Sequence, residues 1–278
     1  MAKIGVFDSG YGGLTILEKM RQHLPEYDYV YLGDNARTPY GTRSFEVIYE
    51  YTWQCVQHLL EEEDAALVVV ACNTASARAL RNIQQLNLPS LWAADGNTIR
   101  RVLGVIRPTV ERVPAFTRTK HVGVLATPGT VASGSYIIEL AKQDPTLKVT
   151  QQPCPMWVPL IENGEHNGNG ADYFVKKDVE TILAHDPLID TLILGCTHYP
   201  LLRPKIEAVL PAGIQLLAQG DLVAESLTDY LHRHTALETL LDKNGTCKFL
   251  TTEHPDKFRQ SAAIFLNTHD LTATHIAL

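Results

Sequence analysis

The sequence has little of what would tie the protein to a membrane or to nucleic acid. Its longest uninterrupted apolar run is the eight residues from Ala65 to Cys72, far short of the roughly 20 that a membrane-spanning helix needs. No block of Lys and Arg occurs, and the formal net charge is −7, whereas binding to phosphate backbones calls for a basic patch. We therefore expect a small-molecule ligand, with no membrane and no nucleic acid as partner.

Cysteine is scarce and shows no pairing pattern. The five cysteines are an odd number without C-x-x-C or C-x-x-H spacing: Cys55, Cys72, Cys154, Cys196 and Cys247. Zinc sites and disulfide frameworks need closer or paired ligands, so we expect no metal and free thiols. No basic-then-apolar leader opens the sequence, which together with free thiols indicates a cytoplasmic protein. Cys55, Cys154 and Cys247 are interpreted as structural.

Short apolar runs alternate with segments of helical period along the whole chain of 278 residues. This alternation predicts an α/β fold with mainly parallel strands. Eight runs are expected to be strands: Lys3–Phe7, Tyr29–Leu32, Leu67–Ala71, His121–Leu125, Lys148–Gln152, Thr191–Leu194, Ile214–Leu217 and Cys247–Leu250.

A weak internal repeat organises these elements. Ile4–Ser9 resembles Val122–Thr127, Pro39-Tyr40-Gly41 has a counterpart in Pro159-Leu160-Ile161, and the block around Cys72 has one around Cys196, each at a spacing of about 120 residues. The common spacing predicts two pseudo-symmetric α/β domains, each with a mainly parallel sheet, and an active site in the cleft between them. We expect residues 1–98 and a returning segment, 212–278, to form the first domain and residues 99–211 the second.

Two cysteine blocks carry the strongest chemical signal. In Val70–Thr74 and in Leu194–His198 a cysteine stands where an apolar strand ends and a helix is expected to begin, a setting that favours a reactive thiol. Ligands of parallel sheets bind at the carboxyl ends of strands, so Cys72 and Cys196 are expected to face one substrate. Two opposed thiols suit racemisation next to a carboxylate, in which one group removes a proton and the other returns one to the opposite face.

Other polar groups occupy similar positions. Asp8-Ser9-Gly10-Tyr11-Gly12-Gly13 ends a strand and opens a helix, where the backbone can approach a carboxylate; Asp8 or Ser9 could equally cap the helix. No G-x-G-x-x-G or Gly-Lys-Ser/Thr occurs there, so nucleotide binding is not indicated. His198 and Glu162 are read as proton carriers if they face the cleft and as ordinary polar residues if they do not.

Several functions remain open on the residues alone. A racemase for aspartate or another acidic amino acid would need the same two thiols, whereas a related decarboxylase would need one. A hydrolase would use a single cysteine with His198 as base, and a two-lobed binding module would need neither. No lysine occupies a strand-end motif, so no pyridoxal cofactor is expected.

The motifs resemble those of the glutamate racemase family, within the aspartate/glutamate racemase superfamily. The matching segments are Asp8–Gly13, Gly33-Asp34 through Pro39-Tyr40-Gly41, Cys72–Ser76, Val158–Glu162 and Gly195–Leu202. The resemblance implies a cofactor-independent enzyme that interconverts L- and D-glutamate, supplies D-glutamate for bacterial peptidoglycan and forms a homodimer. Arg107 departs from the pattern, because many relatives have an acidic residue at that point.

The resemblance also implies residue roles. Cys72 and Cys196 would be the two acid/base residues, assisted by Asp8, His198 and Glu162. A larger set would bind the substrate's ammonium and carboxylate groups: Asp8, Ser9, Tyr40, Gly41, Asn73, Thr74, Thr127, Thr130, Thr197 and His198.

Overall fold

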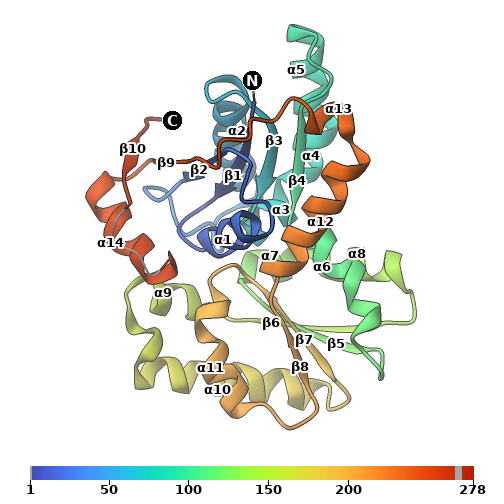
Figure 1. The fold of residues 1–278 in the computed structure, drawn as a ribbon. Coiled ribbons are helices and arrows are strands. Elements are labelled where there is room, and N and C mark those ends of the chain that lie inside the picture. The colour runs from blue at the N-terminus through green and yellow to red at the C-terminus, as the bar shows by residue number, and fades with distance from the viewer. Residues whose placement is uncertain (1, 267–270) are drawn as a thin grey trace.

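Two separate sheets of parallel strands form the framework of the computed structural model, which describes residues 2–266 and 271–278 (Figure 1). The first sheet has the order β10 (Ala273–His275), β9 (Cys247–Thr251), β2 (Tyr29–Gly33), β1 (Lys3–Asp8), β3 (Ala65–Val70) and β4 (Arg101–Gly104). The second has the order β6 (Lys148–Pro153), β5 (His121–Ala126), β7 (Thr191–Gly195) and β8 (Gln215–Leu217). The predicted α/β class with parallel strands is confirmed.

The two sheets share one strand order. The run β2-β1-β3-β4 in the first sheet has the same sequence of crossovers as β6-β5-β7-β8 in the second. In this correspondence β1 matches β5 and β3 matches β7, which are the strands that carry the repeated motifs. The internal repeat seen in the sequence therefore has a structural counterpart.

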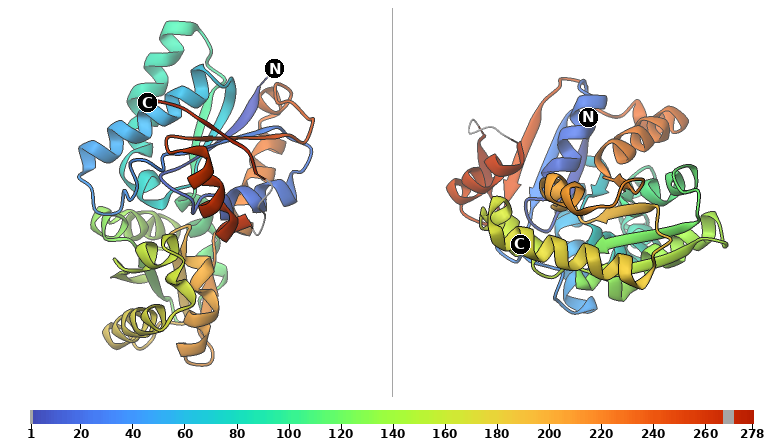
Figure 2. Two further views of the ribbon diagram at one scale, coloured as in Figure 1. Left: turned by 90° about the vertical axis from the view of Figure 1, so that its left-hand side faces the viewer. Right: turned by 90° about the horizontal axis from the view of Figure 1, so that it is seen from below.

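Helices lie on both faces of each sheet (Figure 2). In the first half and its returning segment they are α1 (Leu14–His23), α2 (Phe45–Glu61), α3 (Asn73–Arg78), α4 (Leu80–Asn82), the π-helix η1 (Ile83–Asn87), α5 (Leu88–Asp95), α12 (Gly220–Arg233), α13 (Thr235–Glu238) and α14 (Pro255–Leu266). Around the second sheet they are α6 (Ile106–Arg112), η2 (Val113–Ala115), α7 (Pro128–Ser133), α8 (Ser135–Gln143), α9 (Trp157–Glu162), η3 (Glu165–Asn167), α10 (Asn169–His185), η4 (Tyr199–Leu202) and α11 (Arg203–Val209).

The central strands are apolar throughout because both of their faces are covered. In β1, Ile4 and Val6 pack in the cluster that contains α1, whereas Phe7 packs in the cluster that contains α2. In β7, Ile193 packs with α6 and α8, whereas Leu192 faces the side of α10. Strands buried on two faces read as continuous apolar runs, which made the central strands recognisable. The eight predicted strands are all present.

Two strands, β4 and β10, escaped prediction. β4 pairs with β3 and extends the first sheet to Gly104, while β8 pairs with β7 and extends the second sheet to Leu217. The chain thus passes from the first sheet to the second after Gly104 and returns after Leu217. β4 has one buried side chain among four residues and β10 has none among three, so neither has a recognisable apolar run. The division into two domains stays a prediction.

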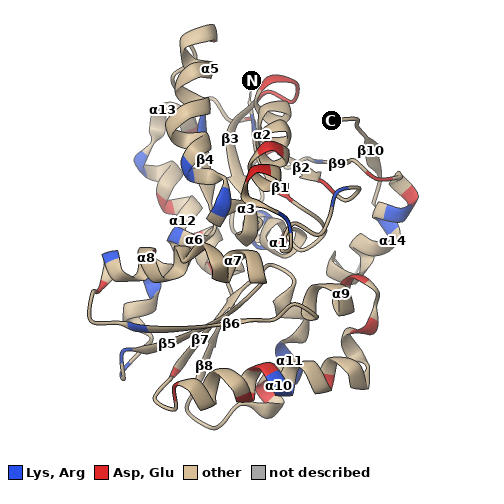
Figure 3. Ribbon diagram, turned by 180° about the vertical axis from the view of Figure 1, so that it is seen from behind, with Lys and Arg blue, Asp and Glu red and all other residues tan. Residues whose placement is uncertain are grey.

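The charged residues are not gathered in one part of the fold. Along the ribbon of Figure 3, Lys and Arg positions and Asp and Glu positions are interspersed over both halves. Within residues 2–266 and 271–278, no helix is long and apolar enough to cross a membrane.

Candidate active site

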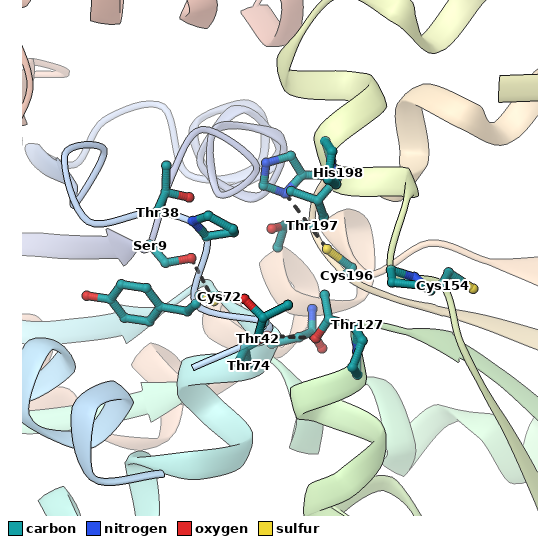
Figure 4. A pocket seen from close by; sticks show the side chains of 18 residues that line it. Ser9, Thr38, Thr42, Cys72, Thr74, Thr127, Cys154, Cys196, Thr197 and His198 are labelled. Carbon is teal, nitrogen blue, oxygen red and sulfur yellow. Dashed lines mark hydrogen bonds between the residues drawn. The ribbon is translucent and has the colours of Figure 1, made fainter. Parts of the chain in front are cut away.

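One pocket is lined from both sheets (Figure 4). Its walls include residues that follow the ends of β1, β3, β5 and β7 by one or two positions, which are Ser9, Cys72, Thr127 and Cys196. The four strand ends meet because parallel strands present their carboxyl ends at the same edge of a sheet. The pocket therefore brings together the two cysteine blocks that the sequence singled out.

Cys72 caps the N-terminus of α3. Its sulfur accepts a hydrogen bond from the backbone N–H of Ala75 at 3.4 Å and lies 3.2 Å from the hydroxyl of Ser9. Burial and the nearby Asp8 carboxylate outweigh these two hydrogen bonds and raise the pKa of Cys72 to about 12. Cys72 is accordingly a protonated thiol at neutral pH.

Cys196 has a different environment. Its Sγ lies 3.8 Å from Nδ1 of His198, and Nε2 of His198 lies 3.0 Å from Oε1 of Glu162. Burial by itself would lower the pKa of His198, but the hydrogen bonds to Cys196 and Glu162 outweigh it and hold that pKa well above 6.5. A thiol, an imidazole and a carboxylate in line form a route for a proton into and out of the pocket.

Asp8 lies fully buried behind the pocket wall and does not line the pocket. Its carboxylate accepts hydrogen bonds from the backbone N–H of Gly10 at 2.9 Å and from the hydroxyl of Thr197 at 3.4 Å. Burial raises the pKa of Asp8, although the nearby His198 opposes the effect. Asp8 thus connects the end of β1 to the segment that carries Cys196.

Three threonine hydroxyls form a cluster between the halves. Thr74 Oγ1 lies 2.9 Å from Thr127 Oγ1 and 3.3 Å from Thr130 Oγ1. Thr127 also caps α7 by accepting from the backbone N–H of Thr130 at 3.3 Å. Thr74 and Thr127 line the pocket, and Thr130 supports them from behind. Such hydroxyls can donate to a carboxylate.

The loop that carries Tyr40 and Gly41 closes another side of the pocket. The Tyr40 hydroxyl donates a hydrogen bond to Asp34, so that its ring lines the pocket while its polar end is already satisfied. The carbonyl oxygen of Gly41 accepts from the backbone N–H of Gly129 at 2.8 Å. This hydrogen bond joins the loop of the first half to α7 of the second.

Most residues singled out from the sequence meet at this pocket. Ten of them line it, namely Ser9, Tyr40, Gly41, Cys72, Asn73, Thr74, Thr127, Cys196, Thr197 and His198. Asp8, Glu162 and Thr130 lie behind the lining residues and contact them. Their individual roles stay predictions.

Sequence reasoning missed other lining residues. Thr38 and Thr42 flank the Pro39-Tyr40-Gly41 motif, and Cys154 and Pro155 come from the segment between β6 and α9. The two threonines could have been predicted from the Pro39-Tyr40-Gly41 motif that they flank. Cys154, which we interpreted as structural, lies at the pocket wall with its thiol donating to the carbonyl of Gln152 at 3.5 Å.

The described part of the chain, residues 2–266 and 271–278, contains no group of three or more His, Cys, Asp or Glu side chains arranged to hold a metal ion. The titratable groups that line the pocket include the thiols of Cys72, Cys154 and Cys196 and the imidazole of His198, with Glu162 and Asp8 behind them. These groups can move protons and can make a nucleophile.

Comparison with known proteins places these features in a family. The sequence model of Asp/Glu/Hydantoin racemases matches residues 4–227. A glutamate racemase from Shouchella clausii is 38% identical over 99% of this chain and 94% of its own length. A glutamate racemase isoform from Bacillus anthracis superposes with a TM-score of 0.85 at 32% identity and covers 100% of this chain and 98% of its own. The Francisella tularensis glutamate racemase, solved in complex with D-glutamate, has a TM-score of 0.85 and 33% identity and covers 99% and 97%.

Proposed function

The chain belongs to the glutamate racemases of the Asp/Glu/hydantoin racemase family, and on that premise we propose that it interconverts L- and D-glutamate through two cysteines without a cofactor. One observation carries the two-cysteine mechanism. Cys72 and Cys196 follow equivalent strands of the two sheets and line the same pocket. A single base cannot easily reach both faces of a carbon, whereas two opposed groups can.

Each turnover transfers one proton out and one proton in. One cysteine, as the thiolate, takes the proton from Cα and becomes a thiol, and the electron pair of the C–H bond is left on a carbon next to the carboxylate. The other cysteine gives its S–H proton to the opposite face of that carbon and becomes a thiolate. The two sulfurs have then exchanged protonation states, and the enzyme is ready for the opposite enantiomer.

The surroundings of the two thiols support unequal proton supply. Cys72 has a pKa raised to about 12 and contacts Ser9, so its protonated form is favoured. Cys196 lies beside His198, which is backed by Glu162, so protons can reach or leave it through the imidazole. The hydroxyls of Thr74 and Thr127 are available to a carboxylate of the amino acid.

Turnover of single enantiomers tests the proposal. L-Glutamate and D-glutamate should each be converted to the other by the purified protein without added cofactor, as followed by circular dichroism, and D-aspartate should not. Cys72→Ala and Cys196→Ala should each abolish both directions, whereas Cys247→Ala, which removes a thiol outside the pocket lining, should not. Conversion of D-aspartate instead would indicate an aspartate racemase. A covalent acyl-enzyme on one cysteine would indicate a hydrolase.

The cellular role follows from the product. D-Glutamate made by this enzyme would supply bacterial peptidoglycan, and the two free thiols suit the reducing cytoplasm. Growth of a D-glutamate-requiring bacterium that expresses the chain, lost with Cys72→Ala, tests this role. A homodimer is expected in solution, and light scattering on the purified protein tests its mass.

A further inference from the structure

Three buried side chains form a closed ring of hydrogen bonds at one end of the pocket. Asn73 Nδ2 donates to Gln219 Oε1 at 2.5 Å, Gln219 Nε2 donates to the Tyr136 oxygen at 3.0 Å, and the Tyr136 hydroxyl donates to Asn73 Oδ1 at 2.8 Å. The residues are 2%, 2% and 0% exposed in that order. Asn73 lines the pocket, whereas Gln219 and Tyr136 do not.

A backbone carbonyl determines which end of the Gln219 amide is the nitrogen, and so which groups of the ring donate. Gln219 Nε2 also reaches the carbonyl oxygen of Val105 at 3.3 Å and Thr109 Oγ1 at 2.9 Å. A carbonyl can only accept, and the Thr109 hydroxyl already gives its hydrogen to Val105 at 2.8 Å. This end of the Gln219 amide must therefore be the nitrogen, and its oxygen must face Asn73.

The same logic fixes Asn73. Because Gln219 presents an acceptor, Asn73 must direct its nitrogen toward Gln219, and its oxygen then accepts from Tyr136. One N–H of the Asn73 amide is used in the ring, which leaves the second as a donor. An Asn73 turned the other way would place its oxygen where its nitrogen now is.

The ring is attached to both passages of the chain between the sheets. Val105 lies between β4 and α6, and Gln219 lies between β8 and α12, so the hydrogen bond from Gln219 to Val105 ties the two passages together. Tyr136 comes from α8 of the second half, whereas Asn73 begins α3 of the first. The ring thus orients a pocket residue of one half with groups of the other.

We propose that Gln219 and Tyr136 are positioning residues that hold the Asn73 amide with its nitrogen as the donor toward a carboxylate of the amino-acid substrate. The inference rests on the proposed function, because it assigns this part of the pocket to an anionic group of glutamate. A wrongly turned Asn73 would present its carbonyl oxygen to the carboxylate and repel it. The wrong orientation of Asn73 would also leave buried polar groups of the ring without hydrogen-bond partners, which costs free energy.

Tyr136→Phe is the first test, because it removes only the hydroxyl that holds Asn73 Oδ1. We expect KM for both L- and D-glutamate to rise about 3- to 10-fold, the effect of one hydrogen bond, with kcat nearly unchanged. Gln219→Met, which removes both ends of the amide, should act in the same direction and is the second variant should the first not fold. Tyr29→Phe is the matched control, since its hydroxyl donates to the carbonyl of Leu24 inside the first half.

A double-mutant cycle separates positioning from a merely structural role. In an Asn73→Ala background, adding Tyr136→Phe should change KM by less than about 1.5-fold, because the group that it positions is gone. The inference is overturned if Tyr136→Phe raises KM equally in the Asn73→Ala background, or if it does not raise KM in the native background. A loss of kcat at constant KM would also overturn it. If the native protein does not convert glutamate, the proposed function fails. The double-mutant cycle can then still be measured, with the Kd of L-glutamate from calorimetry in place of KM.

Discussion

His198 lies between a thiol and a carboxylate, and its protonation depends on both. Its hydrogen bonds to Cys196 and Glu162 overcome the opposing effect of burial and keep its pKa well above 6.5. At neutral pH the imidazole is therefore a cation that faces Cys196 at 3.8 Å. A cation at that distance stabilises a negative charge on the sulfur.

Glu162→Gln should weaken this arrangement without removing the side chain. The neutral amide no longer stabilises the imidazolium, so the pKa of His198 falls, and the pH at which His198 loses its proton moves down. We expect the basic limb of the pH–rate profile to shift to lower pH, and the NMR titration of His198 to shift with it. An unchanged titration of His198 would contradict the assigned contact. Glu165→Gln, which alters a nearby exposed carboxylate of η3, is the control.

Asp8→Asn should raise the stability of the protein and lower its activity at neutral pH. Burial raises the pKa of Asp8 in the folded protein above 3.8, so ionised Asp8 costs stability at neutral pH, and the cost disappears as pH falls toward 3.8. We expect the variant to unfold at higher denaturant concentration than the native protein at pH 7, with the gap closing on acidification, while turnover falls. A variant less stable at pH 7 than the native protein would show that the charged form is favoured by its contacts.

Among single residues, the sequence allowed prediction of the site side chains that lie in strand-end motifs and of few others. Cys72 and Cys196 could be predicted because each follows an apolar run. Gln219 has no motif, since its importance lies in hydrogen bonds to Asn73, Tyr136 and Thr109, which are far away in the chain. Such partners become visible only when the two halves are brought together.

At the scale of elements, the turn before α1 packs directly on the segment after β7. A Cβ atom at Gly12 would lie 2.3 Å from Nδ1 of His198 and 2.4 Å from Oγ1 of Thr197. The Thr15 hydroxyl at the start of α1 also donates to the carbonyl of Thr197 at 3.0 Å. Glycine at position 12 thus allows the close approach that places His198.

Gly12→Ala should therefore displace the segment that carries Cys196 and His198. We expect a loss of about 1–3 kcal/mol in the free energy of unfolding, as for other overpacked sites, and a fall in turnover of about 100-fold from misplaced reacting groups. Gly170→Ala in α10 is the matched control, because the nearest atom to its Cβ is 3.7 Å away. Normal turnover in Gly12→Ala would mean that His198 need not keep this position.

The elements that sequence analysis predicted well are those with two covered faces. β1, β3, β5 and β7 are almost wholly buried, and their apolar runs are unmistakable. β4 and β10 are edge strands whose pairing depends on backbone hydrogen bonds to a neighbour, so their residue types carry little signal.

At the scale of the whole molecule, a ligand in the pocket touches groups of both halves and should stabilise them together. With Cys72→Ser, which keeps each enantiomer unconverted, L-glutamate at 100 times its Kd should raise the free energy of unfolding by about 2.7 kcal/mol. Calorimetry gives the Kd and thermal unfolding gives the shift, with sodium chloride at equal ionic strength as the control. A shift no larger than that of the salt would place the ligand elsewhere.

If Cys72 and Cys196 serve opposite faces of one substrate carbon, each cysteine should exchange the α-hydrogen of one enantiomer with the solvent, which can be measured in D₂O. Each enantiomer is incubated with Cys72→Ser and with Cys196→Ser, and loss of the α-proton signal is followed by NMR. We expect unequal exchange of L- and D-glutamate in each variant, with the preference reversed between the two variants. Equal exchange of both enantiomers in both variants would contradict it.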